Sequence, residues 1–240
     1  MTEHFGCVEF CLPGTLEDKL ETLDELGLWL ELVNISERDL SILSSFSIDI
    51  RSVQAYRLHD LHLLSRDKYA REAATMHIKE TIGIAREVGA ANVIAVPTYG
   101  FDLVSAPFKT CVETFRELSS ESDVNILVEA LSPTRSAFSP SLAEVSKLVK
   151  AINRDNVALA ADTCHIHEGE KDVISTLMDF RDEIVELHLK DSCALPPGKG
   201  ELDFTAVLEI CENTELCLEF MSEDPADLKK ALGYLKSGCK

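Results

Sequence analysis

The sequence predicts an α/β protein with the (β/α)₈ or TIM barrel fold, formed by residues 1–240 as one compact domain. Short apolar runs alternate with longer amphipathic runs along the whole chain, and eight such pairs follow one another. No linker, low-complexity tract or close repeat separates them. Strands that alternate strictly with helices form a parallel sheet, and eight strands close the common barrel. We therefore expect a closed ring of strands.

The expected strands are short runs of mostly apolar residues, as is typical of a parallel sheet that is covered on both faces. The first run, FGCVEFC, ends before Pro13 and Gly14, a pair that turns the chain into the first helix. In chain order, we expect strands at residues 5–11, 28–33, 48–55, 92–97, 124–130, 157–162, 184–190 and 216–221.

The expected helices follow these strands and carry recognisable end signals. Gly27 and Gly89 come directly after amphipathic stretches, where glycine commonly ends a helix. Ser36 is a typical capping residue at the start of the second helix. In chain order, we expect helices at residues 15–26, 36–44, 67–88, 109–119, 141–152, 172–180, 204–211 and 226–235.

An open, doubly wound sheet is the alternative architecture. It would need a glycine-rich phosphate turn after its first strand, and Pro13-Gly14 is a poor candidate for one. The longest irregular stretches follow the third, fifth and seventh strands, so they lie over the C-terminal face of a barrel, where this fold carries its chemistry. The closed barrel is therefore preferred.

Charge and cysteine content restrict the kinds of partner. The chain has 23 basic and 42 acidic residues, a net charge of −19, which disfavours binding to nucleic acid or to an anionic membrane surface. It has no apolar stretch near the ~20 residues of a membrane span and no basic-then-apolar leader. The eight cysteines form no CxxC pair, so we interpret them as reduced, small hydrophobic residues. These features favour a cytoplasmic protein.

Four strands in the second half end with a side chain that can bind a metal. They are Glu129 in ILVEAL, Asp162 in LAADTCH, His188 in ELHLKD and Glu219 in LCLEFM. Burial of an unpaired carboxylate is costly, so a cation or a hydrogen-bond donor usually faces one. In a barrel the four strand ends converge, and three carboxylates with one imidazole suit Mn²⁺, Mg²⁺, Co²⁺ or Zn²⁺. The alternative is that each residue makes a local salt bridge or caps a loop.

The segments ILVEAL, ADTCH, ELHLKDS followed by PPGKGELDF, and LCLEFM, in that order, resemble the xylose isomerase-like TIM barrel superfamily. This group includes sugar and sugar-phosphate isomerases and epimerases, and also endonuclease IV. The resemblance extends over most of the chain. It implies that Glu129, Asp162, His188 and Glu219 bind one divalent metal ion and that His165 holds a substrate oxygen.

The departures from endonuclease IV argue against a three-metal nuclease site. Gln54 stands where that enzyme has a histidine after its third strand, and Val96 precedes Pro97 where it has another. Its Asp-x-His pair after the seventh strand is also absent. His59 and His62 could restore a ligand, although a surface position or local contacts explain them more simply. Nuclease or phosphoesterase activity stays as the alternative function, as does a barrel that binds a small ligand without turnover.

The resemblance implies an isomerase or epimerase that acts on a small carbohydrate-like substrate. The expected chemistry is a metal-assisted 1,2-proton transfer through an enediolate, in which Glu129 and Glu219 remove and return the proton. Lys190 lies two residues after His188 and shares its face of the strand, so it could pair with a substrate anion or with Glu186 or Asp162. Lys199, in a Gly-Lys-Gly loop, could reach a phosphate or carboxylate, or be an exposed turn lysine. A dimer or tetramer would cap an open pocket, although the sequence indicates no interface.

Several other polar and aromatic residues allow a structural interpretation as readily as a functional one. Glu31 in the second strand could line the lower pocket or pair with an early helix. Tyr99 and Phe101 could wall the pocket or pack under the adjacent helix, and His77 in the long helix is expected to be structural or exposed. His167 is expected to face solvent.

Overall fold

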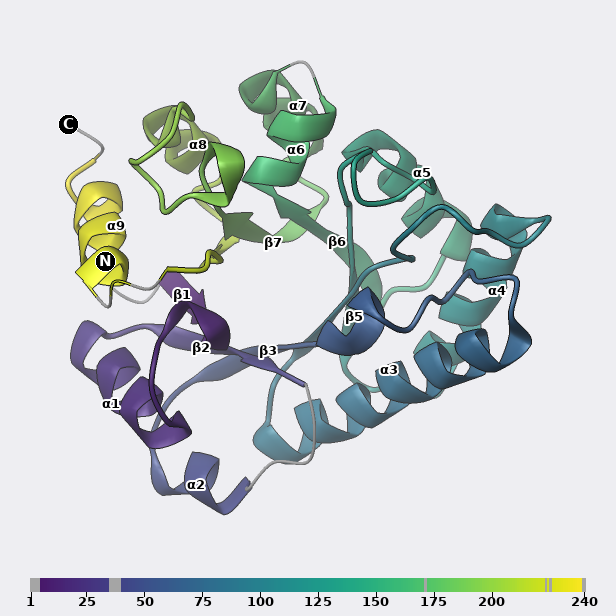
Figure 1. The fold of residues 1–240 in the computed structure, drawn as a ribbon, viewed down its shortest axis with the longest axis horizontal. Coiled ribbons are helices and arrows are strands. Elements are labelled where there is room, and N and C mark those ends of the chain that lie inside the picture. The colour runs from purple at the N-terminus through teal and green to yellow at the C-terminus, as the bar shows by residue number, and fades with distance from the viewer. Residues whose placement is uncertain (1–4, 35–39, 171, 223, 225, 239–240) are drawn as a thin grey trace.

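The computed structural model describes residues 5–34, 40–170, 172–222, 224 and 226–238. Its eight strands are parallel and form a closed barrel in the order of the chain, with β8 paired to β1 (Figure 1). The predicted (β/α)₈ barrel is therefore confirmed. The strands are β1 (Phe5–Val8), β2 (Trp29–Val33), β3 (Ile50–Gln54), β4 (Asn92–Ala95), β5 (Asn125–Glu129), β6 (Val157–Asp162), β7 (Ile184–Leu189) and β8 (Glu215–Leu218).

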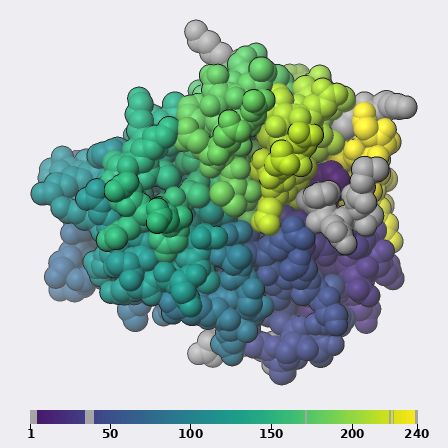
Figure 2. All heavy atoms as spheres, turned by 180° about the vertical axis from the view of Figure 1, so that it is seen from behind, coloured from purple at the N-terminus to yellow at the C-terminus, as the bar shows by residue number. Residues whose placement is uncertain are grey.

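The helices surround this ring of strands (Figure 1). Seen from the opposite side, the parts of the surface near the two ends of the chain adjoin, as the pairing of β8 with β1 requires (Figure 2). No helix among the described residues is long and apolar enough to span a membrane. The α-helices are α1 (Leu16–Leu26), α2 (Leu40–Ser45), α3 (Lys68–Val88), α4 (Pro107–Ser120), α5 (Leu142–Ile152), α6 (Thr163–Gly169), α7 (Val173–Phe180), α8 (Phe204–Ile210) and α9 (Ala226–Lys236).

The predicted helix ends agree with local interactions. Thr15 and Asp18 form a capping box at the start of α1. Gly27 and Gly89 follow α1 and α3 with φ of 64° and 76°, the left-handed conformation that ends a helix. Of the predicted helix at 36–44, residues 36–39 lie outside the described part, and α2 covers the rest.

The structure differs from the sequence-based prediction at several short elements. The predicted strand at 5–11 ends at Val8, because the chain turns into a 3₁₀ helix, η1 (Glu9–Cys11). Two further 3₁₀ helices, η2 (Tyr56–His59) and η3 (Ser192–Ala194), lie in loops. Helix α6 was not predicted, since it follows β6 without a separating turn. Its start is stabilised by Asp162, whose Oδ1 accepts bonds from two backbone N–H groups.

The inside of the barrel has an apolar layer directly beneath the strand ends. Ile94, Leu127 and Ala160 form this small buried cluster. Leu127 and Ala160 each precede a carboxylate, Glu129 and Asp162, by two residues, so they lie one layer lower on the same inward face. The larger apolar core lies between strands and helices and contains most of the other buried hydrophobic residues. Both layers hold the strand ends in fixed positions.

His77 on α3 is a structural residue, one of the two interpretations that the sequence allowed. Its side chain is buried, and Nε2 accepts a bond of 3.3 Å from the backbone N–H of Arg57 in η2. Burial, together with the charge of Arg57, lowers the pKa of His77 to about 4. The neutral imidazole therefore holds η2 against α3.

We predict that acidification will weaken the fold through His77. The unfolded chain binds a proton at this residue below about pH 6.5, whereas the folded chain does not until about pH 4, so stability falls as pH drops between these values. Urea unfolding at pH 7 and pH 5 should show a loss of about 1 kcal/mol, after allowance for solvent screening, that is absent in His77→Gln. His167→Gln, which changes an exposed histidine, should retain the loss. An unchanged pH dependence in His77→Gln would contradict the prediction.

Candidate functional site

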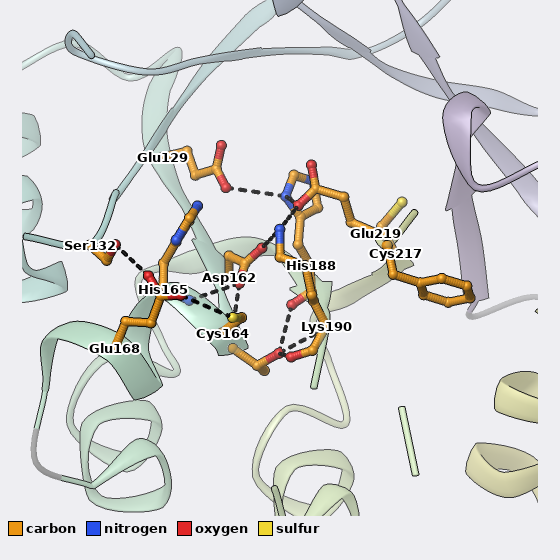
Figure 3. Close-up of polar contacts among 12 residues, drawn as sticks. Glu129, Ser132, Asp162, Cys164, His165, Glu168, His188, Lys190, Cys217 and Glu219 are labelled. Atoms are coloured by element: carbon orange, nitrogen blue, oxygen red, sulfur yellow. Dashed lines mark hydrogen bonds and ion pairs between the residues drawn. The ribbon is translucent and has the colours of Figure 1, made fainter. Parts of the chain in front are cut away.

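Four side chains from different strands meet at the C-terminal end of the barrel. Glu129 ends β5, Asp162 ends β6, His188 lies near the end of β7, and Glu219 follows β8. One ligand atom from each lies within 4.8 Å of the other three, and all four residues are buried. They point toward one another (Figure 3). The structure thus brings together the four residues that the sequence singled out.

His188 lies between two sets of carboxylates. On one side, Nδ1 is 3.3 Å from Glu129 Oε1 and 3.5 Å from Glu219 Oε2. On the other side, Nε2 is 2.9 Å from Oε2 of Glu31, which is fully buried in β2. A histidine that binds a metal commonly donates its second N–H to a carboxylate, and Glu31 is placed to receive it. Nδ1 is then the nitrogen that faces the four-residue group.

The charges of these residues depend on one another. Burial alone would lower the pKa of His188, but Glu31 and Glu219 outweigh burial and raise it well above its usual value. Burial raises the pKa of Glu31 itself. The contact of its carboxylate with His188 Nε2 places Glu31 in a lower polar layer and not at an early helix, so Glu31 supports the imidazole from below.

A second polar group lies beneath the first and shares His188 with it. Glu31, Glu186, His188 and Cys217 also have ligand atoms within 4.8 Å of one another. Glu186 accepts a hydrogen bond from Ser52 Oγ, and all of these residues are fully buried. We interpret this layer as the support of His188, because its carboxylates already bond to the imidazole and to Ser52.

Lys190 bridges two of the four converging residues. Its Nζ is 2.7 Å from Asp162 Oδ2 and 2.7 Å from Glu219 Oε2. Of the pairings that the sequence left open, the one with Asp162 is therefore observed. Burial would raise the pKa of Glu219, but Lys190 and His188 hold it well below its usual range, so this carboxylate is ionised.

His165 reaches the site through α6. It lies three residues after Asp162, whose carboxylate accepts a bond of 2.9 Å from the His165 backbone N–H. The side chain is buried, and its Nδ1 has no hydrogen-bond partner within the described part of the chain. A buried, unpaired nitrogen is costly unless something bonds to it, so His165 is suited to hold an oxygen of a bound molecule.

These residues line a pocket of about 290 Å³, a size that suits a small molecule. Glu129, Glu219, His165 and Lys190 line it, and Tyr56, Phe10 and Phe220 supply aromatic surface. Tyr99 also lines the pocket, as one of its two interpretations predicted, whereas Phe101 is exposed and does not.

His59 holds the Tyr99 side chain at the pocket. Its Nδ1 is 2.6 Å from the carbonyl oxygen of Tyr56, so this nitrogen donates, and Nε2 accepts from the Tyr99 hydroxyl at 2.7 Å. His62 Nε2 is 3.3 Å from the carbonyl oxygen of His59. Neither histidine belongs to the converging ligand groups of the described residues. The local-contact interpretation of His59 and His62 therefore holds.

Two further pocket residues were not identified as functional from the sequence. Gln54, where the nuclease resemblance expects a histidine, donates from Nε2 to Glu219 Oε1 at 3.1 Å. Arg135, in the loop after β5, lines the pocket and is exposed. The sequence signal for Gln54 was its place at the end of a predicted strand, whereas Arg135 lies farther along the loop after β5 and had no local signal.

The expectation for Lys199 is corrected by the structure. Its Nζ forms an ion pair with Asp227 Oδ1 at 2.7 Å, and it does not line the pocket. The surrounding loop is built around Asp191, whose carboxylate accepts four backbone N–H bonds of 2.8 to 3.0 Å, from Ser192, Gly198, Gly200 and Leu202. A Cβ at Gly200 would lie 2.3 Å from Asp191 Oδ1, so the loop needs glycine there. The Gly-Lys-Gly loop thus encloses a carboxylate of the protein itself.

The donor set of the four-residue group fits a divalent cation. Three carboxylates and one imidazole within 4.8 Å of one another combine oxygen ligands with one nitrogen. The second nitrogen of the imidazole faces the carboxylate of Glu31, which is the usual arrangement for a histidine that binds a metal.

The cysteines form no disulfide among the described residues. Seven cysteines lie in this part of the chain, all are free, and six of them are buried.

The chain matches the family described as xylose isomerase-like TIM barrel over residues 5–238. A probable endonuclease 4 from Clostridium botulinum (strain Alaska E43 / Type E3) is 26% identical over 148 residues, which are 51% of this chain and 53% of that protein. The chain therefore spans about half the length of this curated relative.

Solved structures share the fold at low sequence identity. The 3-keto-D-glucoside 4-epimerase from E. coli has a TM-score of 0.82 at 17% identity, covering 98% of this chain and 99% of that one. D-Psicose 3-epimerase from Clostridium cellulolyticum H10, solved with D-tagatose, has 0.82 at 15%, covering 99% of both chains. The IolI protein with a bound zinc atom has 0.78 at 19%, covering 98% and 96%.

We predict that Asp191→Asn will destabilise the protein. An amide nitrogen cannot accept a hydrogen bond, so at least one of the buried N–H groups around this side chain loses its partner. Urea unfolding should show a loss of about 1–3 kcal/mol. Asp172→Asn is the matched control, since Asn caps a helix about as well as Asp and this residue is an exposed cap of α7. Equal stability of the two variants would contradict the prediction.

Proposed function

The chain belongs to the xylose isomerase-like TIM barrel family, and we propose that it is a divalent-metal-dependent isomerase or epimerase of a small sugar or sugar phosphate. The observation that carries the proposal is the convergence of Glu129, Asp162, His188 and Glu219 beside a small pocket. Two of these residues, Glu129 and Glu219, line the pocket, so they can reach a bound molecule.

Similarity to known proteins supports the same class of activity. Two of the structures that share the fold are sugar epimerases, and a third contains zinc. The probable endonuclease 4 favours the nuclease alternative, but Gln54 replaces a histidine expected of a nuclease and here bonds to Glu219. A net charge of −19 also opposes binding to DNA. We therefore prefer the isomerase or epimerase.

In the proposed reaction, Glu129, Asp162, His188 and Glu219 hold the divalent ion. When bound, such an ion supplies charge that polarises a carbonyl group and acidifies the neighbouring C–H bond. Lys190 and His165 both line the pocket, so their side chains are placed to bind substrate oxygens. The apolar layer below and the aromatic residues beside the site limit access of water to the reacting carbon.

The two pocket glutamates carry out the proton transfer. Glu219 is ionised, so one of its oxygens can accept the proton from the carbon next to the carbonyl. The electron pair of that C–H bond forms the double bond of an enediolate. Glu129, from β5, enters the step as the acid and gives its own carboxyl proton to the neighbouring carbon in an isomerisation, or to the opposite face of the same carbon in an epimerisation. Glu219 then releases its proton to solvent and Glu129 takes one up before the next turnover. The reverse reaction exchanges their roles.

We predict that Glu129→Gln and Glu219→Gln will each abolish most of the proton exchange. An amide can neither accept nor return the proton, so the rate should fall about 10²- to 10⁴-fold. The measurement is deuterium incorporation from D₂O into ketoses, hydroxypyruvate and inososes, followed by NMR. Glu113→Gln changes an exposed glutamate on α4 and should keep the full rate. If the metal-loaded protein exchanges no proton with any of these compounds, the proposed reaction is wrong.

We predict one bound divalent ion per chain and its loss on treatment with a chelator. Asp162→Asn should bind Mn²⁺ at least about tenfold more weakly, because it removes one charged ligand while an amide oxygen can still cap α6. Elemental analysis and titration with Mn²⁺ measure both quantities, with Asp172→Asn as the control. Three ions per chain, together with cleavage of abasic DNA, would favour the nuclease. A protein with no affinity for divalent ions would favour a ligand-binding barrel without turnover.

A further inference from the structure

The pocket contains a cation that no acidic group of the described chain neutralises. Arg135 lines the pocket and is exposed, and its guanidinium forms no ion pair or hydrogen bond with a described residue. The other cationic residue of the pocket, Lys190, is held by Asp162 and Glu219. Of the lysine and arginine residues that line the pocket in the described chain, Arg135 is thus the one whose side chain is available to an anion.

The backbone of Arg135 is fixed by contacts between two loops. Its carbonyl oxygen accepts a bond of 2.9 Å from the N–H of Gly100, and the Gly100 carbonyl oxygen accepts one of 3.1 Å from Ala137. Gly100 and Ser136 form an isolated parallel bridge. The N–H of Arg135 donates to the carbonyl oxygen of Ser132 at 2.9 Å. These backbone bonds hold the loop in one conformation, which lowers the entropic cost of using its arginine for binding.

The charge of Arg135 affects the pKa of one nearby acidic residue, Glu168, but the Glu168 carboxylate is hydrogen-bonded to other residues. Its carboxylate accepts a bond from Ser132 Oγ at 2.7 Å and one from Thr134 Oγ1 at 3.2 Å. Burial would raise the pKa of Glu168, but these two hydrogen bonds, with smaller contributions from His165 and Arg135, lower it. Glu168 therefore senses the charge of Arg135 without forming an ion pair with it.

Arg135 and the central carboxylates belong to one pocket, which Glu129, Glu219, Tyr99 and Arg135 all line. Burial raises the pKa of Tyr99, the charges of Glu129 and Glu219 raise it further, and those of Lys190 and Arg135 oppose them. A molecule in this small pocket can contact the central group with one end and the arginine with the other.

We propose that Arg135 binds an anionic group of the substrate, a carboxylate or a phosphate, so that the enzyme acts on an acidic hydroxy-carbonyl compound and not on a neutral sugar. A guanidinium group matches both anions, because it can donate two parallel N–H bonds to their oxygens. The inference rests on the proposed function, to which it adds the substrate class and a specificity-determining residue. The exposure of Arg135 assigns the anion to the mouth of the pocket and the reacting carbonyl to the interior.

Three small hydroxyketones test the effect of an anionic group on binding, because they share the same reacting end and differ in charge. Dihydroxyacetone, dihydroxyacetone phosphate and hydroxypyruvate share a hydroxymethyl ketone and differ in the third carbon, which carries a hydroxyl, carries a phosphate, or is itself the carboxylate carbon. Their binding to the full chain can be measured by calorimetry, with and without added Mn²⁺. We expect phosphate, carboxylate or both to bind at least about tenfold more tightly than the neutral compound, and Arg135→Met to remove this preference.

Arg154→Met is the matched control, because Arg154 is also exposed, has no ion pair with a described residue, and does not line the pocket. It changes the net charge by the same amount and should keep the preference. Arg135→Lys should retain part of it, since an ammonium group keeps the charge but not the paired geometry. The phosphate and carboxylate arms show which anion the site selects.

The binding measurements test the role of Arg135, whereas proton exchange tests the proposed function. An anion preference that depends on Arg135 supports the inference even if no probe exchanges a proton, in which case only the proposed function is wrong. Equal binding of the three probes to the unmodified protein, no binding of either anionic probe, or an unchanged preference in Arg135→Met would overturn the inference. Proton exchange with a neutral ketose by the unmodified protein, at a rate equal to that with the anionic probes, would also overturn the inference, while the proposed function would stand.

Discussion

The burial of His188 among carboxylates is the interaction on which the rest of the site depends. Its ring separates Glu129 and Glu219 on one side from Glu31 on the other, and none of these groups is exposed to solvent to any large extent. A buried carboxylate without a partner costs several kcal/mol, so each must face a donor or a cation. The imidazole, Lys190 and Gln54 supply these partners.

This constraint explains why the site is built on strand ends. Residues that must balance one another's charge need fixed separations, and strands within a closed barrel cannot shift independently. Beneath the strand ends, β4, β5 and β6 contribute the apolar layer of Ile94, Leu127 and Ala160, whereas β7 contributes the buried polar residue Glu186. The polar half supports the histidine, and the apolar half closes the floor beneath the carboxylates.

Carboxylates also organise the loops above the barrel. Asp162 starts α6 and thereby directs His165 to the pocket, while Asp191 gathers four backbone N–H groups and closes the loop before α8. In both cases an aspartate near the end of a strand accepts hydrogen bonds from backbone N–H groups that would otherwise need water as their acceptor. Residues of the same motifs therefore serve both the candidate chemistry and the architecture. The Gly-Lys-Gly loop is an example of the architectural role, because its glycines make room for Asp191 and its lysine pairs with Asp227.

The alternation of apolar and amphipathic runs was sufficient to predict the barrel. The local pattern distinguishes strands from helices, and the number of strand–helix units, eight, predicts that the sheet closes. The position of Glu129, Asp162, His188 and Glu219 at strand ends was also readable, because parallel strands bring their C-terminal ends to one face. The short elements η1 and α6 were not predictable in this way. Residues Glu9–Cys11 of η1 continue the mostly apolar run of β1, and Asp162 both ends β6 and caps α6, so neither boundary leaves a break in the pattern. Only the tertiary structure decided the partners of each side chain: Lys190 pairs with Glu219, His59 with Tyr99 and Lys199 with Asp227, while the Arg135 side chain has no partner in the described part of the chain. These pairings join residues from 28 to 40 positions apart, and they depend on register and side-chain direction, which a linear pattern does not contain.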